Sequence, residues 1–267
     1  MRRLTTVTLG LASLLWLASS CSTEELTGNQ ELSSTEKKQL EALAYSTHEA
    51  TRFSETDPIA GSRNGYVLEG DLKLTEEEVA MQAVLSTQEI EGEQYRVSNT
   101  VTGPRTINII GWTGAGYALP PNVQQALSWA VANYNRENIS LYFNLTFGAS
   151  TTGQSIIVYQ INGPGNVHSG YPSGGSPYRY IQVDSGAVNY SLDLLEWHLT
   201  HHIGHCIGFA HTNYYVSSPC HPNPSTSSIH IPGTPTSDPG SVWNTCPQNP
   251  VTGEFSPYDR IALQYLF

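Results

Sequence analysis

Basic residues are scarce in this sequence. Its 267 residues contain 12 Lys and Arg against 23 Asp and Glu. Two of the bases, Arg2 and Arg3, belong to an N-terminal export segment, and without them 10 basic residues face 23 acidic ones, a net charge of −13. Binding to a polyanion needs a basic surface. The composition therefore predicts no nucleic-acid partner.

Cysteine is also sparse. Beyond Cys21 there are three cysteines, Cys206, Cys220 and Cys246. In an oxidising compartment three cysteines allow one disulfide by any of three pairings, with one thiol left over. We favour a bond that involves Cys220, because either pairing would brace the C-terminal part of the chain.

Export is predicted from residues 1–20. Arg2 and Arg3 precede an apolar run that is too short and too early for a spanning helix and that ends in small residues before Cys21. This order is similar to a bacterial lipoprotein cleavage site, at which Cys21 becomes the lipidated N-terminus. We expect a lipoprotein signal peptide at 1–20 and an exported, membrane-anchored bacterial lipoprotein at the outer membrane or cell surface. Ordinary secretion, with Cys21 unmodified, is the alternative.

The acidic residues are unevenly distributed. Residues 22–100 contain 16 acidic and 6 basic residues, whereas residues 101–267 contain 7 and 4. This shift predicts a tether and prosegment-like region at 21–100 and a larger domain at 101–267. The low apolar content of the first region allows a flexible tether, but the strand-like "GYVLEGDLKLT" favours a prosegment that folds against the domain.

From residue 101 the sequence predicts an α+β domain. We expect strands at 105–112, 139–147, 155–161 and 179–186, the last at the edge of the sheet, and helices at about 120–135 and 191–206 and after Ser256. This order of elements indicates a mixed sheet backed by two helices.

Histidines on the second helix form the most informative pattern. Two imidazoles at i and i+4, His201 and His205, share one helix face and can reach one tetrahedral ion. Gly208 ends the helix, and the turn it permits can return His211 as a third ligand. The opposite face is predicted to enter the core with Leu192, Leu195, Leu199, Ile203 and Cys206.

The motif from His201 to Thr212 resembles that of the metzincin zinc peptidases, most closely the bacterial lipoproteins called dual-action HEIGH metallopeptidases. The resemblance implies a metzincin-like zinc peptidase domain with a small irregular C-terminal lobe ending in a helix. It also implies Zn²⁺ on His201, His205 and His211, and a peptide or protein substrate along the edge strand, hydrolysed through a zinc-bound water.

Two landmarks of that family are missing. His202 stands where the family has its general-base glutamate, and Trp243 in "SVWNT" stands where it has a methionine; no methionine follows Met81. A general base typically contributes ~10²- to 10⁴-fold. We therefore expect a metallopeptidase of impaired activity, with His202 as an imperfect catalytic base. The alternative is an inactive, zinc-stabilised pseudopeptidase that binds peptides or surface partners.

The fourth position on the metal is open to several residues. His202 or His198 could fill it and make the zinc structural. Family prosegments can also latch the metal through an acid or a cysteine. No cysteine occurs at 22–100, so Asp57 and Asp71 are the candidates for such a latch.

Overall fold

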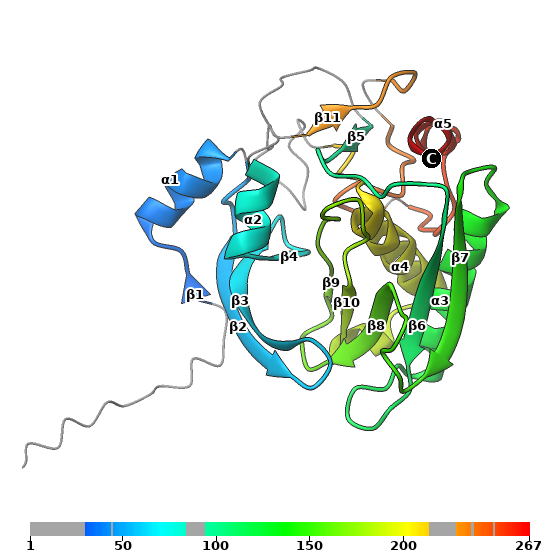
Figure 1. Ribbon diagram of the computed structural model, residues 1–267, viewed down its shortest axis with the longest axis horizontal. Helices are drawn as coiled ribbons and strands as arrows, with labels where there is room; N and C mark the ends of the chain where they lie inside the picture. Colours follow the sequence, from blue (N-terminus) through cyan, green and yellow to red (C-terminus); the bar gives the residue numbers. More distant parts are fainter. Residues whose placement is uncertain (1–29, 44, 84–93, 214–227, 236–237, 248) are drawn as a thin grey trace, which may run out of the picture.

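The computed structural model describes residues 30–43, 45–83, 94–213, 228–235, 238–247 and 249–267 (Figure 1). A five-stranded sheet forms the centre of the larger domain, in the order β7 (Leu141–Gly148), β6 (Arg105–Trp112), β8 (Ile156–Ile161), β10 (Tyr180–Asp184) and β9 (Val167–His168). Four strands are parallel and β9 is antiparallel to β10. The sheet is backed by α3 (Pro121–Arg136) and α4 (Leu192–Ile207). The expected α+β class is confirmed.

One expectation about this sheet is wrong. The strand predicted at 179–186 as an edge strand, β10, is one position inside the sheet, because Val167 and His168 pair with it on its outer side. A two-residue strand within a Gly- and Pro-rich loop shows no alternating pattern, so it could not be recognised in the sequence.

The helices begin and end where the sequence signals them. Pro120 caps α3 and Pro121 is its first residue, and the Ser191 side chain accepts a hydrogen bond from the Leu194 N–H at the start of α4. Gly208 ends α4 with a φ of 120°, a left-handed conformation that favours glycine. The core face of α4 is buried as predicted, except that Leu192 is 37% exposed.

A smaller lobe follows α4. Strand β11 (Ile229–His230) pairs with β5 (Tyr95–Arg96), and α5 (Pro257–Leu266) closes the chain. The Ser256 cap of α5 forms the predicted capping box with Asp259. A short 3-10 helix, η1 (Ser185–Asn189), joins β10 to α4.

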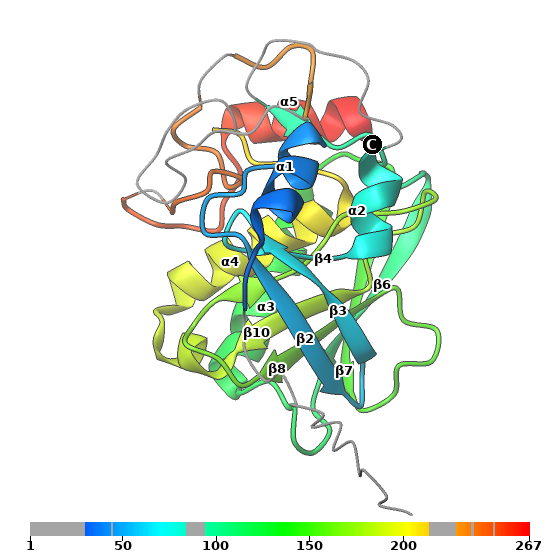
Figure 2. The ribbon, with the colours of Figure 1, turned by 90° about the vertical axis from the view of Figure 1, so that its left-hand side faces the viewer.

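The N-terminal region forms its own antiparallel sheet, in the order β1 (Gln30–Glu31), β2 (Thr51–Asp57), β3 (Gly61–Leu68) and β4 (Leu72–Thr75), with α1 (Ser34–Ala42) and α2 (Glu76–Ala83). Figure 2 shows the long β2–β3 hairpin crossing in front of the five-stranded sheet, and Figure 1 shows the same hairpin to the left of that sheet, on the side away from α3.

That hairpin covers the second face of the parallel sheet. Side chains alternate between faces along a strand, so Ile109 packs toward the helices while Ile110 packs with Ile157 and Tyr159 on the other face. Ile59 and Ala60, in the turn between β2 and β3, pack against this second cluster. Among the described residues, no helix is long and apolar enough to cross a membrane.

Candidate metal centre

Three histidines converge at the C-terminal end of α4. His201 and His205 lie one turn apart on the helix, and after Gly208 the chain returns so that His211 faces both of them. The Nε2 atom of His211 lies 3.2 Å from the Nε2 atoms of His201 and of His205. The three side chains are 0–1% exposed. The structure thus brings together the three residues that the sequence predicts as ligands.

The outer nitrogen of each ring has an oxygen partner. His201 Nδ1 lies 2.9 Å from the carbonyl oxygen of Val242, and His205 Nδ1 lies 2.7 Å from that of Phe209. His211 Nδ1 lies 3.0 Å from Glu69 Oε2. A carbonyl oxygen only accepts hydrogen bonds, so Nδ1 of His201 and of His205 carries the proton. Their Nε2 lone pairs are then directed toward the centre of the cluster.

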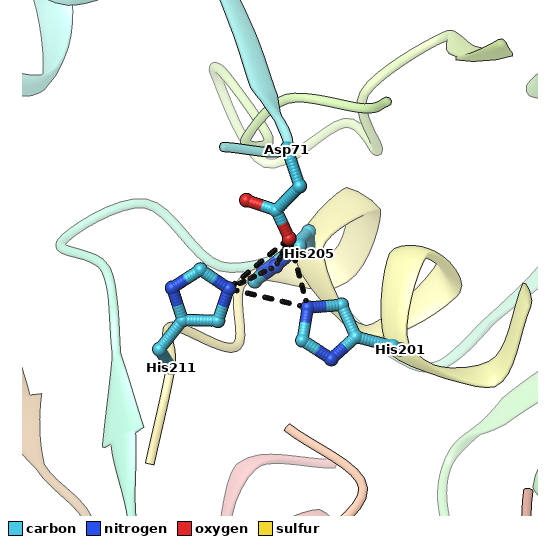
Figure 3. Close-up of side chains that lie close together, drawn as sticks. All are labelled: Asp71, His201, His205 and His211. Carbon is cyan, nitrogen blue, oxygen red and sulfur yellow. Dashed lines mark hydrogen bonds and ion pairs between the residues drawn. The ribbon is translucent and has the colours of Figure 1, made fainter. Parts of the chain in front are cut away.

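A carboxylate completes this cluster from the opposite side. Asp71, in the turn between β3 and β4, places Oδ2 at 3.1 Å from Nε2 of both His201 and His211, and at 3.5 Å from Nε2 of His205 (Figure 3). From the sequence, Asp71 and Asp57 were only candidates for an acidic prosegment residue that binds the metal. Asp57 is elsewhere, where it accepts hydrogen bonds from the Ile59 and Ala60 N–H groups and the Tyr159 hydroxyl.

The spacing of the four atoms is close to that around a tetrahedral cation. Ligand atoms 2.0–2.1 Å from a zinc ion at tetrahedral corners are about 3.3 Å from one another. The distances from Asp71 Oδ2 to the three Nε2 atoms, and from His211 Nε2 to those of His201 and His205, run from 3.1 to 3.5 Å, and all four atoms lie within 4.8 Å of one another. Asp71, His201, His205 and His211 form a group that could hold a metal ion. The donor set of three imidazoles and one carboxylate suits zinc.

Burial and charge set the protonation of the cluster when no cation is bound. Burial alone would raise the pKa of Asp71, but the facing histidines hold it well below its usual value of 3.8. Burial lowers the pKa of His201 to about 3. For His211, burial also disfavours the charge, but Asp71 and Glu69 outweigh it and raise the pKa to about 10. A divalent cation would take over the role of this proton on His211.

His202 does not join the cluster. Its ring is 1% exposed, and its Nδ1 lies 2.9 Å from the hydroxyl oxygen of Ser169. On the other side it stacks at 6.4 Å on His198, which in turn stacks at 5.8 Å on Tyr190. Burial lowers the pKa of His202 well below its usual value of 6.5, so the ring is neutral at pH 7. Neither His202 nor His198 lies in the fourth position, which Asp71 occupies.

The turn that contains Trp243 lies directly beside the ligands. The Val242 carbonyl accepts from His201, and the Trp243 carbonyl accepts from the Thr212 N–H at 2.9 Å, next to His211. The Trp243 ring is fully buried and stacks on Phe209 at 3.7 Å. The turn therefore contacts His201 and the neighbour of His211 through backbone carbonyl groups. These contacts do not require a methionine side chain.

Other predictions for single residues had mixed outcomes. Cys206 is a buried free thiol, so the two pairings that include it do not form. Cys246 is disulfide-bonded, and Cys220 lies outside the described residues. Among the histidines outside the cluster, His168 is 7% exposed and lies 3.7 Å from Asp184. His230 is half-buried, and His221 lies outside the described residues.

The sequence reasoning missed Glu69 altogether. Its signal was present, because a glycine between two acids, Glu69 and Asp71, separates the apolar pairs of two short strands. That pattern places both carboxylates at the tip of a hairpin. What the sequence could not supply is the position of this tip against helix α4, more than a hundred residues away.

Comparison with known proteins gives the family of this chain. No curated protein matches it. Two solved structures of myroilysin are similar, each at 12% identity. The match to the first covers 63% of this chain and 82% of the myroilysin chain, with a TM-score of 0.43. The match to the second covers 72% of this chain and 96% of the myroilysin chain, with a TM-score of 0.42. The sequence pattern of the dual-action HEIGH metallo-peptidases matches residues 66–267, which include the β3–β4 hairpin tip and every residue of the cluster. The chain therefore belongs to the dual-action HEIGH metallopeptidase family, as its motif indicated.

Proposed function

We propose that this chain is a zinc-binding metallopeptidase whose capacity to hydrolyse peptide bonds is impaired by His202. Zinc would be held by His201, His205 and His211, with Asp71 as the fourth ligand in the conformation described here. The observation that carries the proposal is the convergence of four ligand atoms within 4.8 Å of one another, with Asp71 Oδ2 and His211 Nε2 each 3.1–3.5 Å from the other ligand atoms, which is close to the spacing around a tetrahedral ion.

With all four protein ligands in place, the proposed zinc site would be closed to water and substrate. Catalytic zinc sites keep one position for water or substrate, whereas four protein ligands make a closed, structural site. When bound, zinc is a Lewis acid that makes water acidic enough to react near neutral pH. With Asp71 in the fourth position, neither water nor a peptide could reach the metal. Asp71 must therefore leave before a peptide can be hydrolysed.

Impairment follows from the environment of His202. A general base works best when its pKa lies near the working pH. Burial lowers the pKa of His202, and its Nδ1 is occupied by Ser169. A glutamate at this position would bring a negative charge that an imidazole cannot provide.

A second candidate is supported by the same two features. Asp71 closes the site and His202 replaces the carboxylate, which is what an inactive pseudopeptidase that binds peptides or surface partners would need. In either case we propose a peptide or protein as the partner, no nucleic acid, and a lipid anchor on Cys21 that attaches the exported chain to a membrane.

The test compares four forms of the mature, zinc-loaded chain: the natural sequence, Asp71→Ala, His202→Glu and the double variant. Each is assayed for zinc content and for cleavage of an unstructured protein. We expect about one zinc per chain in every form, and the fastest cleavage by the double variant. Asp71→Ala alone should be slower by roughly 10²- to 10⁴-fold, the typical contribution of a general base.

Each other outcome contradicts part of the proposal. Absence of zinc from the natural chain, purified without chelator, would refute the metal site. Equal cleavage by Asp71→Ala and the double variant would show that His202 is an adequate base. If all forms hold zinc and none cleaves, the chain is a binding module.

A further inference from the structure

The tip of the β3–β4 hairpin carries two carboxylates, and each contacts the metal cluster in a different way. Leu68 and Leu72 are paired across the hairpin and fully buried, which fixes the three residues between them. Of these, Asp71 faces the inner Nε2 atoms of all three histidines, whereas Glu69 faces the outer Nδ1 of His211. Gly70, with a φ of 88°, separates the two.

Glu69 is held in this position at a cost. Its side chain is 0% exposed, and its φ of 56° is left-handed, a conformation that side-chain-bearing residues seldom adopt. A buried carboxylate needs a partner, and the partner that Glu69 Oε2 has is His211 Nδ1 at 3.0 Å. A buried carboxyl side chain on a strained backbone persists only where the surrounding structure holds it in place, and such residues are concentrated at functional sites.

His211 is the ligand that most needs such a partner. His201 and His205 belong to one helix and donate Nδ1–H to the backbone of the same domain, at Val242 and Phe209. His211 lies after the helix, and its Nδ1 is oriented by a side chain of the N-terminal region. A carboxylate on the outer nitrogen fixes the tautomer and strengthens the inner nitrogen as a ligand.

We propose that Glu69 is a positioning residue for the metal centre, which orients His211 from the hairpin, so that docking of the hairpin and binding of the metal strengthen each other. This inference rests on the proposed zinc site. Withdrawal of the tip would remove the fourth ligand and the partner of the third ligand together. Because such coupling is reciprocal, zinc also increases the affinity of the domain for the hairpin.

The test measures zinc affinity of the full mature chain by competition with a chelator, in the natural sequence and in Glu69→Gln, Glu69→Gly and Glu77→Gln. Glu77 is an exposed acid on the nearby helix α2 and serves as the matched control. We expect Glu69→Gly to weaken zinc binding by about 10- to 100-fold, the usual effect of losing an outer partner. Glu69→Gln, which can still accept from Nδ1–H, should lose less, and Glu77→Gln nothing.

The glycine variant separates the carboxylate from the backbone. Glycine adopts a left-handed φ readily, so if Glu69 only shaped the turn, Glu69→Gly would bind zinc as well as the natural chain or better, and the inference would be overturned. The second readout is the ¹⁵N chemical shift of His211 Nδ1 in the zinc-loaded chain, which should move in both Glu69 variants and stay fixed in Glu77→Gln. If this shift is unchanged, Glu69 does not act through His211. A natural chain that binds no zinc would instead refute the proposed function.

Discussion

At the scale of single residues, the replacement of the family's methionine by Trp243 is compensated by its neighbours. The indole packs against a helix position that has no side chain, since a Cβ on Gly204 would overlap Trp243 Nε1. Gly204 thus lies at the Nε1 edge of the indole, whereas the face of the ring stacks on Phe209, with an interplanar angle of 5°. The missing methionine therefore does not by itself indicate loss of the metal site.

This packing predicts that substitutions at Trp243 and Gly204 have coupled effects on the free energy of unfolding. Trp243→Met should reduce the free energy of unfolding by about 3 kcal/mol, as expected for truncating a large buried side chain, while zinc content stays the same because the turn contacts the ligands through carbonyl groups. Gly204→Ala should be destabilising in the natural chain, where the new methyl group meets the indole, and better tolerated in the Trp243→Met background, where the indole is gone. A double-mutant cycle in urea measures this coupling, and strict additivity would contradict it.

At the scale of elements, largely buried ion pairs join strands β2, β3 and β4, and the same carboxylate reaches the five-stranded sheet through a neutral amide. Glu55 accepts from Arg63 at 2.6 Å and from Lys73 at 2.9 Å, and its carboxylate is also 3.0 Å from the Gln182 side-chain amide on β10. Burial would raise the pKa of Glu55, but Lys73 and Arg63 outweigh it and lower the pKa from its usual 4.5.

The lowered pKa predicts how stability depends on pH. A carboxyl group whose pKa is lower in the folded state contributes stability above its unfolded pKa and loses it as the pH falls through the folded value. Glu55→Gln should therefore reduce the free energy of unfolding by roughly 3 kcal/mol at pH 7, because it leaves buried cations unpaired. The difference in free energy of unfolding between the natural chain and Glu55→Gln should become smaller below pH 4.5. Urea unfolding from pH 7 to pH 3 measures it, and a difference that does not change with pH would be inconsistent with this role.

Elements differ in how far the sequence could predict them. The candidate ligands His201, His205 and His211 lie within eleven positions, so helix periodicity and one glycine were enough to predict that they come together. Strand β9 is two residues long, and Asp71 and Glu69 come from a hairpin that is distant in sequence. Their places depend on tertiary packing, about which local patterns carry no information.

At the scale of the whole molecule, the N-terminal region is part of the structure that surrounds the metal centre. The family pattern begins at residue 66, within β3 and well before the charge boundary near residue 100. Parallel sheets are stable when both faces are covered, and one face of this sheet, with Ile110, Ile157 and Tyr159, is covered by residues from the β2–β3 hairpin. Residues 94–101 likewise pair with the smaller lobe and with the end of α4, as in the bond from the Val97 N–H to the Gly208 carbonyl at 2.9 Å.

A fragment that begins at residue 94 should therefore be much less stable than the mature chain. Exposing three buried apolar side chains costs roughly 1.5–3 kcal/mol each, and at this chain length that is a fall in Tm of about 10 °C or more. The exposed face should also bind a hydrophobic dye. Adding residues 22–83 as a separate peptide should restore both properties, and zinc should tighten that complex because Asp71 and Glu69 reach the histidines from the peptide. Equal Tm values and no dye binding would mean instead that the N-terminal region only covers a domain that is complete without it.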